Sequence, residues 1–265
     1  MLPMDIVASW NKEGAKFGWM GIGEFEALNF DLREMGKDGE VPAIKFVAWK
    51  ADMLNSLASP VVDFGLDLGD TKLNDAGMKQ VCRFTSLHSL DIGFTLVTDA
   101  GIQELASLKS LKALNLRFVN VTDVGMKDVA RIKSLELLIL RGTKTSDAGI
   151  KDIASLNALQ SLDLTYVPVS DAGMMHLRNL TSLHTLFLFK TEISDAGLKH
   201  LSKFKSLRFL ALDETNITNA GLNELAGLKS LRSLSLTGSR VTRGGIAELQ
   251  KSLPNTKIIN YEVED

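Results

Sequence analysis

The sequence has little or none of the features that mark a secreted, membrane-bound or disulfide-stabilised protein. Cys82 is the single cysteine among 265 residues, so the chain forms no internal disulfide. No stretch approaches the roughly 18 consecutive apolar residues of a membrane span, and the first residues, MLPMDIVASWNKEGAK, contain no signal-type apolar run. We therefore expect a cytoplasmic protein without membrane contact, although a leader removed before residue 1 would leave no trace in the sequence.

An excess of charge of either sign is also lacking. The chain has 30 basic and 32 acidic residues, for a net charge of −2. Because no basic field is present, general binding to nucleic acids or anionic membranes has no support. Hydrophobic residues make up 45% and charged residues 23% of the chain, which is the balance of a folded globular protein.

What the sequence does contain is an internal repeat. Glycines recur every 24 residues, at positions 77, 101, 125, 149, 173, 197, 221 and 245, in segments such as TDAGI and SDAGM. A second recurring segment of the form LxxLxL lies upstream, as in LHSLDIGFT. Its two-residue alternation predicts a short strand, and the Ser or Thr before Asp predicts the N-cap of a short helix. We expect the recurrent glycine to be required by a close approach of neighbouring turns.

One such unit buries too little apolar surface to offset the cost of ordering its backbone, so the units must stack into a solenoid. The pattern LxxLxLxxTxVTDAGLxxLxxLxx, over roughly residues 61–261, resembles the leucine-rich-repeat family. It is similar to the 24-residue repeats of bacterial members and to the repeats of F-box substrate receptors. The resemblance implies an α/β fold, a right-handed horseshoe with parallel strands on the concave face and short helices on the convex face.

The two ends of the chain depart from the repeat. We expect residues 1–60 to form an N-terminal cap, with a helix over 5–12 and a β-hairpin of 28–32 with 41–47. Residues 41–57 also fit an irregular first repeat, with 41–47 as its strand and 51–57 as its helix. Residues 61–253 then hold eight repeats.

The C-terminal segment, residues 254–265, is expected to add a last strand and an acidic tail. Here we expect the period to slip by one residue, so that Ile259 and Tyr261 take the places of Leu234 and Leu236. The charged residues that follow would discourage further strand pairing at this edge.

No arrangement of residues in the repeat register points to catalysis. His176 and His200 occupy the same helix position in adjacent repeats, but with Asp152 one repeat away they form at most a weak metal site. We expect no enzyme activity, no resident metal and no cofactor.

Function is then expected at the outward strand positions, which vary between repeats. Aromatic, aliphatic and arginine side chains flanked by acids have the composition of a protein interface. The candidate contact residues are Leu137, Ile139, Phe187, Phe189, Phe209, Arg117, Arg141, Tyr166, Phe118, Phe94, Asp163 and Asp213.

The leading interpretation is a non-catalytic scaffold that binds a protein or peptide on its concave sheet. The alternative is a substrate-recruiting or regulatory subunit of an enzyme assembly, an F-box-like adaptor engaged through the N-terminal segment. Two structural interpretations stay open beside these. Phe94, Phe118 and Tyr166 could seal the corner between strand and loop, and the remaining phenylalanines could pack on one another. Self-association through this face or through a sheet edge is a further interpretation.

Overall fold

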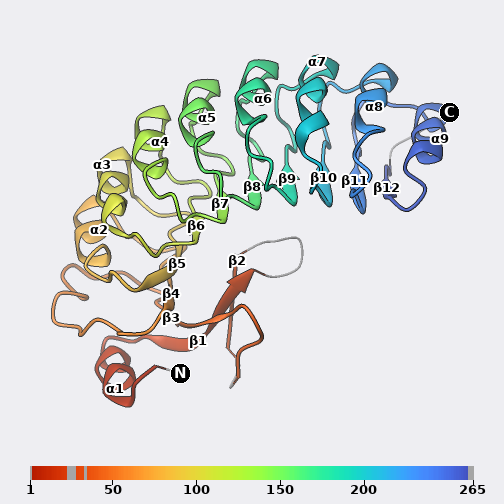
Figure 1. Cartoon of the computed structure of the whole chain (residues 1–265). Helices are drawn as coiled ribbons and strands as arrows, with labels where there is room; N and C mark the ends of the chain where they lie inside the picture. The colour runs from red at the N-terminus through yellow and green to blue at the C-terminus, as the bar shows by residue number, and fades with distance from the viewer. Residues whose placement is uncertain (1, 23–27, 33–34, 262–265) are drawn as a thin grey trace.

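The computed structural model describes residues 2–22, 28–32 and 35–261, which form one curved solenoid (Figure 1). Strands line the inner side of the arc and helices line its outer side, as the sequence predicted. The described strands form one sheet in the order β12-β11-β10-β9-β8-β7-β6-β5-β4-β3-β1-β2. Its parallel strands are β3 (Val41–Lys45), β4 (Phe64–Asp67), β5 (Leu87–Asp91), β6 (Ala113–Asn115), β7 (Leu137–Ile139), β8 (Ser161–Asp163), β9 (Thr185–Phe187), β10 (Phe209–Ala211), β11 (Ser233–Ser235) and β12 (Lys257–Ile259).

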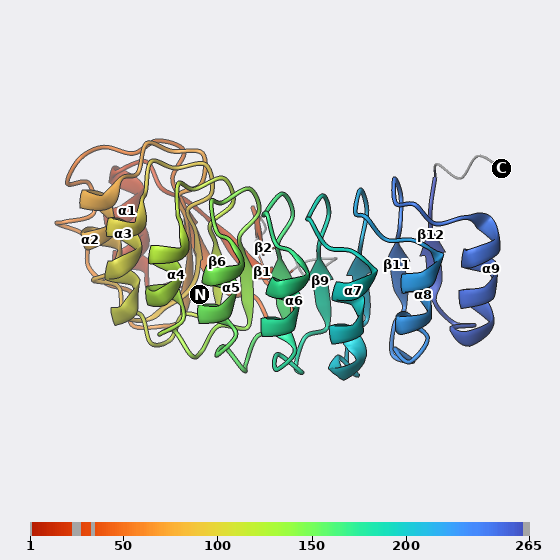
Figure 2. The same ribbon diagram turned by 90° about the horizontal axis from the view of Figure 1, so that it is seen from above.

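A short helix follows most of these strands on the outer side, and the helices run side by side along the array (Figure 2). The α-helices are α2 (Asp75–Val81), α3 (Asp99–Ile102), α4 (Asp123–Val129), α5 (Asp147–Ile153), α6 (Asp171–Leu177), α7 (Asp195–Leu198), α8 (Asn219–Leu225) and α9 (Arg243–Ser252). Helices α3 and α7 continue as 3-10 helices, η2 (Gln103–Ser107) and η3 (Lys199–Lys203).

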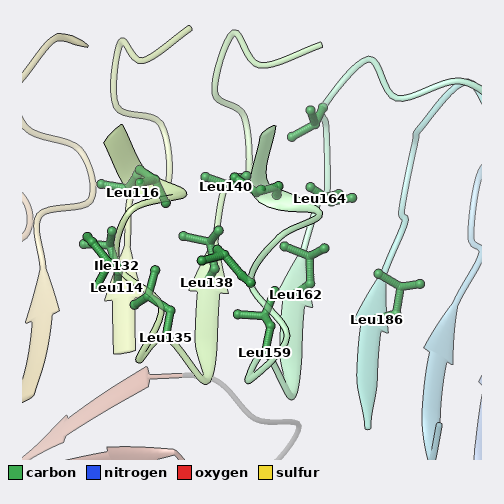
Figure 3. Packing of buried hydrophobic residues seen from close by; sticks show 14 of the residues in the cluster. Leu114, Leu116, Ile132, Leu135, Leu138, Leu140, Leu159, Leu162, Leu164 and Leu186 are labelled. Carbon is green, nitrogen blue, oxygen red and sulfur yellow. The ribbon is translucent and has the colours of Figure 1, made fainter. Parts of the chain in front are cut away.

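The repeated leucines form the core between the sheet and the helices. Equivalent leucines of successive strands are paired in register, as Leu138 is with Leu162 and Leu162 is with Leu186. All three are fully buried and point away from the concave face (Figure 3). Because side chains alternate between the faces of a strand, the residues on either side of each leucine belong to the concave face.

In most repeats a carboxylate joins the start of the helix to the next repeat, and in α8 the amide oxygen of Asn219 does so. Thr98, Thr122 and Ser146 are N-caps, as predicted, and each accepts from a backbone N–H of its own helix. The Asp after the cap reaches forward to the following repeat. Asp123 accepts from Ser146 N and Ser146 Oγ at 2.7 Å each and from Gly149 N at 2.9 Å. Although burial acts to raise the pKa of Asp123, these three hydrogen bonds lower it overall.

This contact explains the recurrent glycine. A Cβ atom placed on Gly149 would lie 2.6 Å from Asp123 Oδ1, 2.7 Å from Thr145 Cγ2 and 2.8 Å from Met126 Cγ. The equivalent Cβ atoms on Gly101 and Gly125 would also lie 2.6 Å from the carboxylate of the preceding repeat. The expected close approach of neighbouring turns is confirmed, and the group that approaches is the aspartate.

Replacing Gly149 by alanine is therefore expected to destabilise the protein by about 1–3 kcal/mol. The gain in helix propensity, about 1 kcal/mol, is smaller than the cost of overpacking together with weakened hydrogen bonds to a carboxylate. Urea-induced unfolding measures the change. Gly227→Ala is the matched control, because the nearest atom to its Cβ would be Lys205 Nζ at 3.7 Å. Equal stability of the two variants would contradict this explanation.

The structure of the N-terminal segment agrees with part of what the sequence predicted for residues 1–60. Helix α1 (Met4–Lys12) lies where a helix was expected, and β3 is the first parallel strand, with Ile44 opposite Leu66. The predicted hairpin is wrong. Strand β1 (Lys16–Ile22) lies between β2 (Leu28–Asp31) and β3 and pairs antiparallel with both. Residues 51–57 form turns where a helix was predicted.

The C-terminal register was also predicted wrongly. Ile258, 24 residues after Leu234, lies opposite that leucine, so the period does not slip. The buried Thr256 fixes this register by donating from Oγ1 to the carbonyl of Leu231 at 2.7 Å. Tyr261 is 83% exposed, so it does not take a core position. The predicted acidic tail, residues 262–265, lies outside the described residues.

Candidate binding surface on the concave face

The N-terminal hairpin β1–β2 lies inside the arc and covers part of the concave face (Figure 1). Met20 of β1 and Leu28 of β2 form an apolar cluster with Ala43, Ala113, Leu137 and Ile139, and the half-buried Phe30 packs against it. Leu137 is 0% exposed and Ile139 is 9% exposed. The prediction that these two residues are open to a partner is therefore wrong, because the chain covers them with its own hairpin.

Small residues on the concave face make room for this hairpin. A Cβ atom on Gly65 of β4 would lie 2.8 Å from Met20 Cβ and 2.9 Å from its sulfur. Ala113 of β6 is buried in the same cluster as Met20. The small side chains of these repeats therefore allow the hairpin to pack closely against the concave face.

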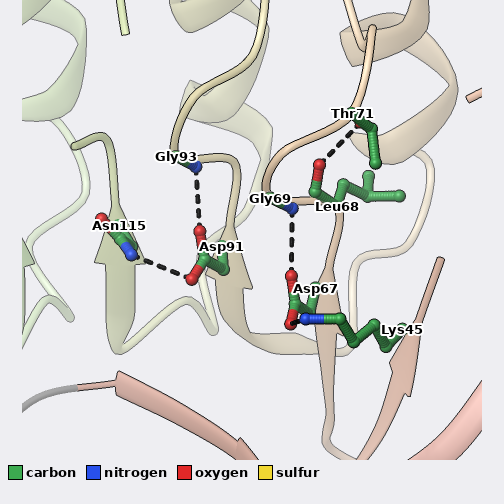
Figure 4. A network of polar contacts seen from close by, with 8 residues as sticks. All are labelled: Lys45, Asp67, Leu68, Gly69, Thr71, Asp91, Gly93 and Asn115. Atoms are coloured by element: carbon green, nitrogen blue, oxygen red, sulfur yellow. Dashed lines mark hydrogen bonds and ion pairs between the residues drawn. The ribbon is translucent and has the colours of Figure 1, made fainter. Parts of the chain in front are cut away.

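A row of polar groups crosses the same repeats (Figure 4). Lys45 of β3 forms an ion pair with Asp67 of β4 at 2.6 Å, and its ammonium lies 5.6 Å from the ring centre of Phe30. On the next two strands, Asn115 Nδ2 donates to Asp91 Oδ2 at 2.9 Å. The row therefore connects β2 of the hairpin to the first repeats.

Asp91 is the most perturbed carboxyl group of this row. Burial and the neighbouring charge of Asp67 raise its pKa to about 6. Hydrogen bonds from Gly93 N and Asn115, together with the charge of Arg117, act in the opposite direction. Asp91 is thus held in place by donors of its own and of the next repeat.

Beyond the hairpin, two phenylalanines on neighbouring strands form an aromatic pair. The rings of Phe187 on β9 and Phe209 on β10 lie 4.9 Å apart at an interplanar angle of 45°. Both side chains are half-buried. Phe189, two residues after Phe187, makes an edge contact with Tyr166 at 5.2 Å between ring centres. Mutual packing, which the sequence left open, therefore holds for these rings while part of their surface stays accessible.

The aromatic residues that follow the strands form a rim along the concave face. Phe94, Phe118 and Tyr166 are 43%, 43% and 40% exposed. Their backbones share a left-handed conformation, with φ of 57°, 53° and 59°. Phe94 stacks on Phe118 at 4.8 Å, and the Phe118 ring fills the space above Gly142, where a Cβ atom would collide with it. The rim rings therefore pack on neighbouring repeats and still present about two fifths of their surface to solvent.

Two arginines and a lysine lie over these rings. The guanidinium of Arg117 lies 4.7 Å from the ring centre of Phe94. That of Arg141 lies between Phe118, at 6.0 Å, and Tyr166, at 5.4 Å. Lys190 lies 5.6 Å from Tyr166 and also forms an ion pair with Glu214 at 3.3 Å. These positions are within the range of a cation–π interaction.

The two predicted acidic contact residues serve the backbone. Asp163 accepts from Thr165 N at 2.8 Å, and burial raises the pKa of this carboxyl group. Asp213 accepts from Thr237 N at 2.9 Å and from the hydroxyl of Ser235. Both side chains are half-buried. Both carboxylates therefore stabilise the backbone at the ends of the strands, and these hydrogen bonds hold them in position beside the aromatic residues.

Sequence reasoning missed the hairpin residues Met20, Leu28 and Phe30, and Lys45 beside them. The alternation of Leu28 and Phe30 was visible, but their partner strand was not. Strand β1, KFGWMGI, contains two glycines, which weaken any strand prediction.

Comparisons with known proteins agree with this geometry. A family model described as "Leucine Rich repeat" matches residues 107–130. An internalin C2 from Listeria monocytogenes superposes with a TM-score of 0.59 at 21% identity, over 79% of this chain and 83% of that one. The chain has the fold of a leucine-rich-repeat protein. An internalin (inlF) from the same species gives a TM-score of 0.61 at 24% identity, over 76% of this chain and 54% of that chain. The comparison with curated proteins gives no match.

These similarities establish a leucine-rich-repeat fold. Among the described residues, no helix is both long and apolar enough to cross a membrane. The same part of the chain contains no group of three His, Cys, Asp or Glu side chains placed to hold a metal ion.

Proposed function

We propose that this leucine-rich-repeat protein is a non-catalytic scaffold that binds a protein or peptide on the open part of its concave face. The surface is centred on Phe187 and Phe209 and extends to Phe189 and Tyr166. Curved solenoids use their concave sheets as extended binding surfaces. Half-exposed aromatic residues at the centre of such a face, with polar groups around them, have the composition of a binding hot spot.

The aromatic pair on β9 and β10 carries the proposal. Before it, the hairpin covers Leu137 and Ile139 of β7. After it, β11 presents Ser233 and Ser235. Phe187 and Phe209 instead place two half-buried aromatic rings side by side on this face. The hydrophobic effect favours removing such rings from water, and a partner can do this at little cost in backbone order because the strands hold the rings rigidly.

The variant Phe187→Ser with Phe209→Ser is expected to weaken binding by about tenfold or more, as loss of hot-spot aromatic residues does. Fragments of the source proteome displayed on phage and selected on the wild-type protein supply defined ligands, whose affinities are measured by calorimetry. Met175→Ser is the control, since Met175 is 42% exposed on helix α6 at the outer side.

Circular dichroism and urea unfolding establish that both variants keep the fold. Unchanged affinity of the phenylalanine variant, or an equal loss with Met175→Ser, would place the binding surface elsewhere.

A further inference from the structure

Two guanidinium groups, those of Arg117 and Arg141, lie over the aromatic rings of the rim. Lys45, Lys112, Arg131 and Lys190 each form an ion pair with a carboxylate. The guanidinium groups of Arg117 and Arg141 form neither an ion pair nor a hydrogen bond with any described residue. The Nε–H of Arg141 is in addition buried without an acceptor. A buried donor that is left unsatisfied has a free-energy cost.

The nearest carboxylates are engaged by other groups. Asp91, which feels the charge of Arg117, is held by Gly93 N at 2.8 Å and by the amide of Asn115 at 2.9 Å. Asp163, which feels the charge of Arg141, accepts from the backbone of Thr165. Burial raises the pKa of both acids.

The aromatic rings hold the two guanidinium groups in fixed positions. Arg117 lies over Phe94, and Arg141 lies between Phe118 and Tyr166. A guanidinium stacked in this way still presents the N–H groups at its edge, which match the two oxygens of a carboxylate. Because the rings restrict the side chains before binding, less conformational entropy is lost when an anion binds.

We propose that Arg117 and Arg141 bind carboxylate side chains of the partner, so that the ligand of the concave face is an acidic peptide segment. This inference rests on the proposed function and adds the chemistry of the partner to it. Arg117 and Arg141 lie on adjacent repeats, whose strands are about 4.8 Å apart. Two acidic residues separated by one residue in an extended peptide, about 6–7 Å apart, reach both guanidinium groups.

The same extended segment would reach the aromatic pair. From the repeat of Arg141 to that of Phe187 the sheet advances by two strands, or about 10 Å. An extended peptide covers this distance in about three residues. The expected ligand therefore carries two acidic residues and, about three residues further on, an apolar or aromatic side chain that contacts Phe187 and Phe209.

The test is a selection from a library of random twelve-residue peptides displayed on phage, carried out on the full-length protein. Wild type is compared with Arg117→Glu plus Arg141→Glu. The control is Lys127→Glu plus Lys151→Glu, which makes the same change in net charge on the exposed side of α4 and α5. Arg117→Gln plus Arg141→Gln removes the charge with little change in shape and serves if the glutamate variant does not fold.

Peptides selected on wild type are expected to be enriched in Asp and Glu, and their affinity should fall by about tenfold or more in the glutamate and glutamine variants. Affinity should also weaken with added salt, and the lysine control should bind like wild type. Selected peptides without acidic enrichment, or with equal affinity for the arginine variants, would overturn the inference.

The two proposals fail in different ways. If the peptides lack acidic residues but lose affinity for Phe187→Ser with Phe209→Ser, the concave binding surface stands and its acidic specificity does not. If wild type selects no peptide above background, or if neither variant alters binding, both proposals are overturned for linear peptides.

Discussion

Replacing Trp10 by alanine is expected to destabilise the protein by about 3–5 kcal/mol, the usual cost of removing a large buried aromatic side chain. Trp10 is 0% exposed and lies 5.0 Å from the ring of Phe84 and 6.0 Å from that of Phe46. Its indole N–H donates to the carbonyl of Ala58 at 3.0 Å. The alanine variant loses these ring contacts and the hydrogen bond to Ala58. Urea unfolding measures the change when it is monitored by far-ultraviolet circular dichroism, since tryptophan fluorescence is altered by the substitution itself.

Two further variants separate packing from other effects. Trp10→Phe keeps a ring and loses the hydrogen bond, so it should cost less than alanine. Met4→Ala lies on the same helix at a side chain that is 88% exposed and should leave stability within about 0.5 kcal/mol of wild type. A Trp10→Ala variant as stable as Met4→Ala would mean that helix α1 does not belong to the core.

This prediction also bears on the role proposed for residues 1–60. We propose that they cap the open end of the solenoid, because Trp10 joins the same buried cluster as the leucines of the first repeats. A separate adaptor module, the alternative function, would leave the repeats stable when it is removed. Deleting residues 1–40 is therefore informative beside Trp10→Ala, since unfolding indicates a cap and a stable remnant that has lost a partner indicates a module.

Replacing Leu137 by alanine is expected to cost about 3 kcal/mol, although alternation places Leu137 on the concave face. The reason is the hairpin, because Leu137 is completely buried in the cluster with Met20 and Leu28. An exposed leucine on the face of a solenoid would change stability by less than about 0.5 kcal/mol. Leu96→Ala is the control, since Leu96 is 62% exposed in the same solenoid. Urea unfolding of both variants is the measurement.

A double-mutant cycle tests the hairpin directly. Leu28 and Leu137 belong to one apolar cluster. The changes in unfolding free energy caused by Leu28→Ala and Leu137→Ala should therefore be non-additive by about 0.5 kcal/mol or more. Additive effects together with a neutral Leu137→Ala would show that the hairpin does not cover the concave face in solution. In that case Leu137 and Ile139 would be accessible and would belong to the candidate binding surface.

The repeat could be predicted from sequence because each of its parts acts over a short range. The alternation of leucines, the N-cap Ser or Thr and the glycine of the first turn depend on neighbours in the chain or on the same position one repeat away. Since the repeat period is constant, the residue at the equivalent position of the next repeat could also be identified from the sequence. The glycine at 149 shows the limit, because the close approach could be expected while the carboxylate of Asp123 could not be identified.

The candidate site was predicted in part. Phe187, Phe209 and the rim aromatics lie where the register placed them, with the two arginines over the rim rings. Leu137 and Ile139 were placed on the right face and given the wrong environment, because the residues that cover them come from more than a hundred positions earlier in the chain. No local pattern in the sequence reports such a long-range contact.

The sequence by itself determined the solenoid, its parallel sheet and the side of each strand on which every side chain lies. These properties follow from a repeated local pattern whose units bury their leucines only by stacking. The tertiary structure alone decided that the hairpin covers Leu137 and Ile139, because β1, an antiparallel strand with two glycines, inserts between β2 and β3. It also decided that Asp91 and Asp163 are held by neighbouring donors, while the guanidinium groups of Arg117 and Arg141 have no acceptor among the described residues. Hydrogen bonding depends on distances that only the folded chain sets.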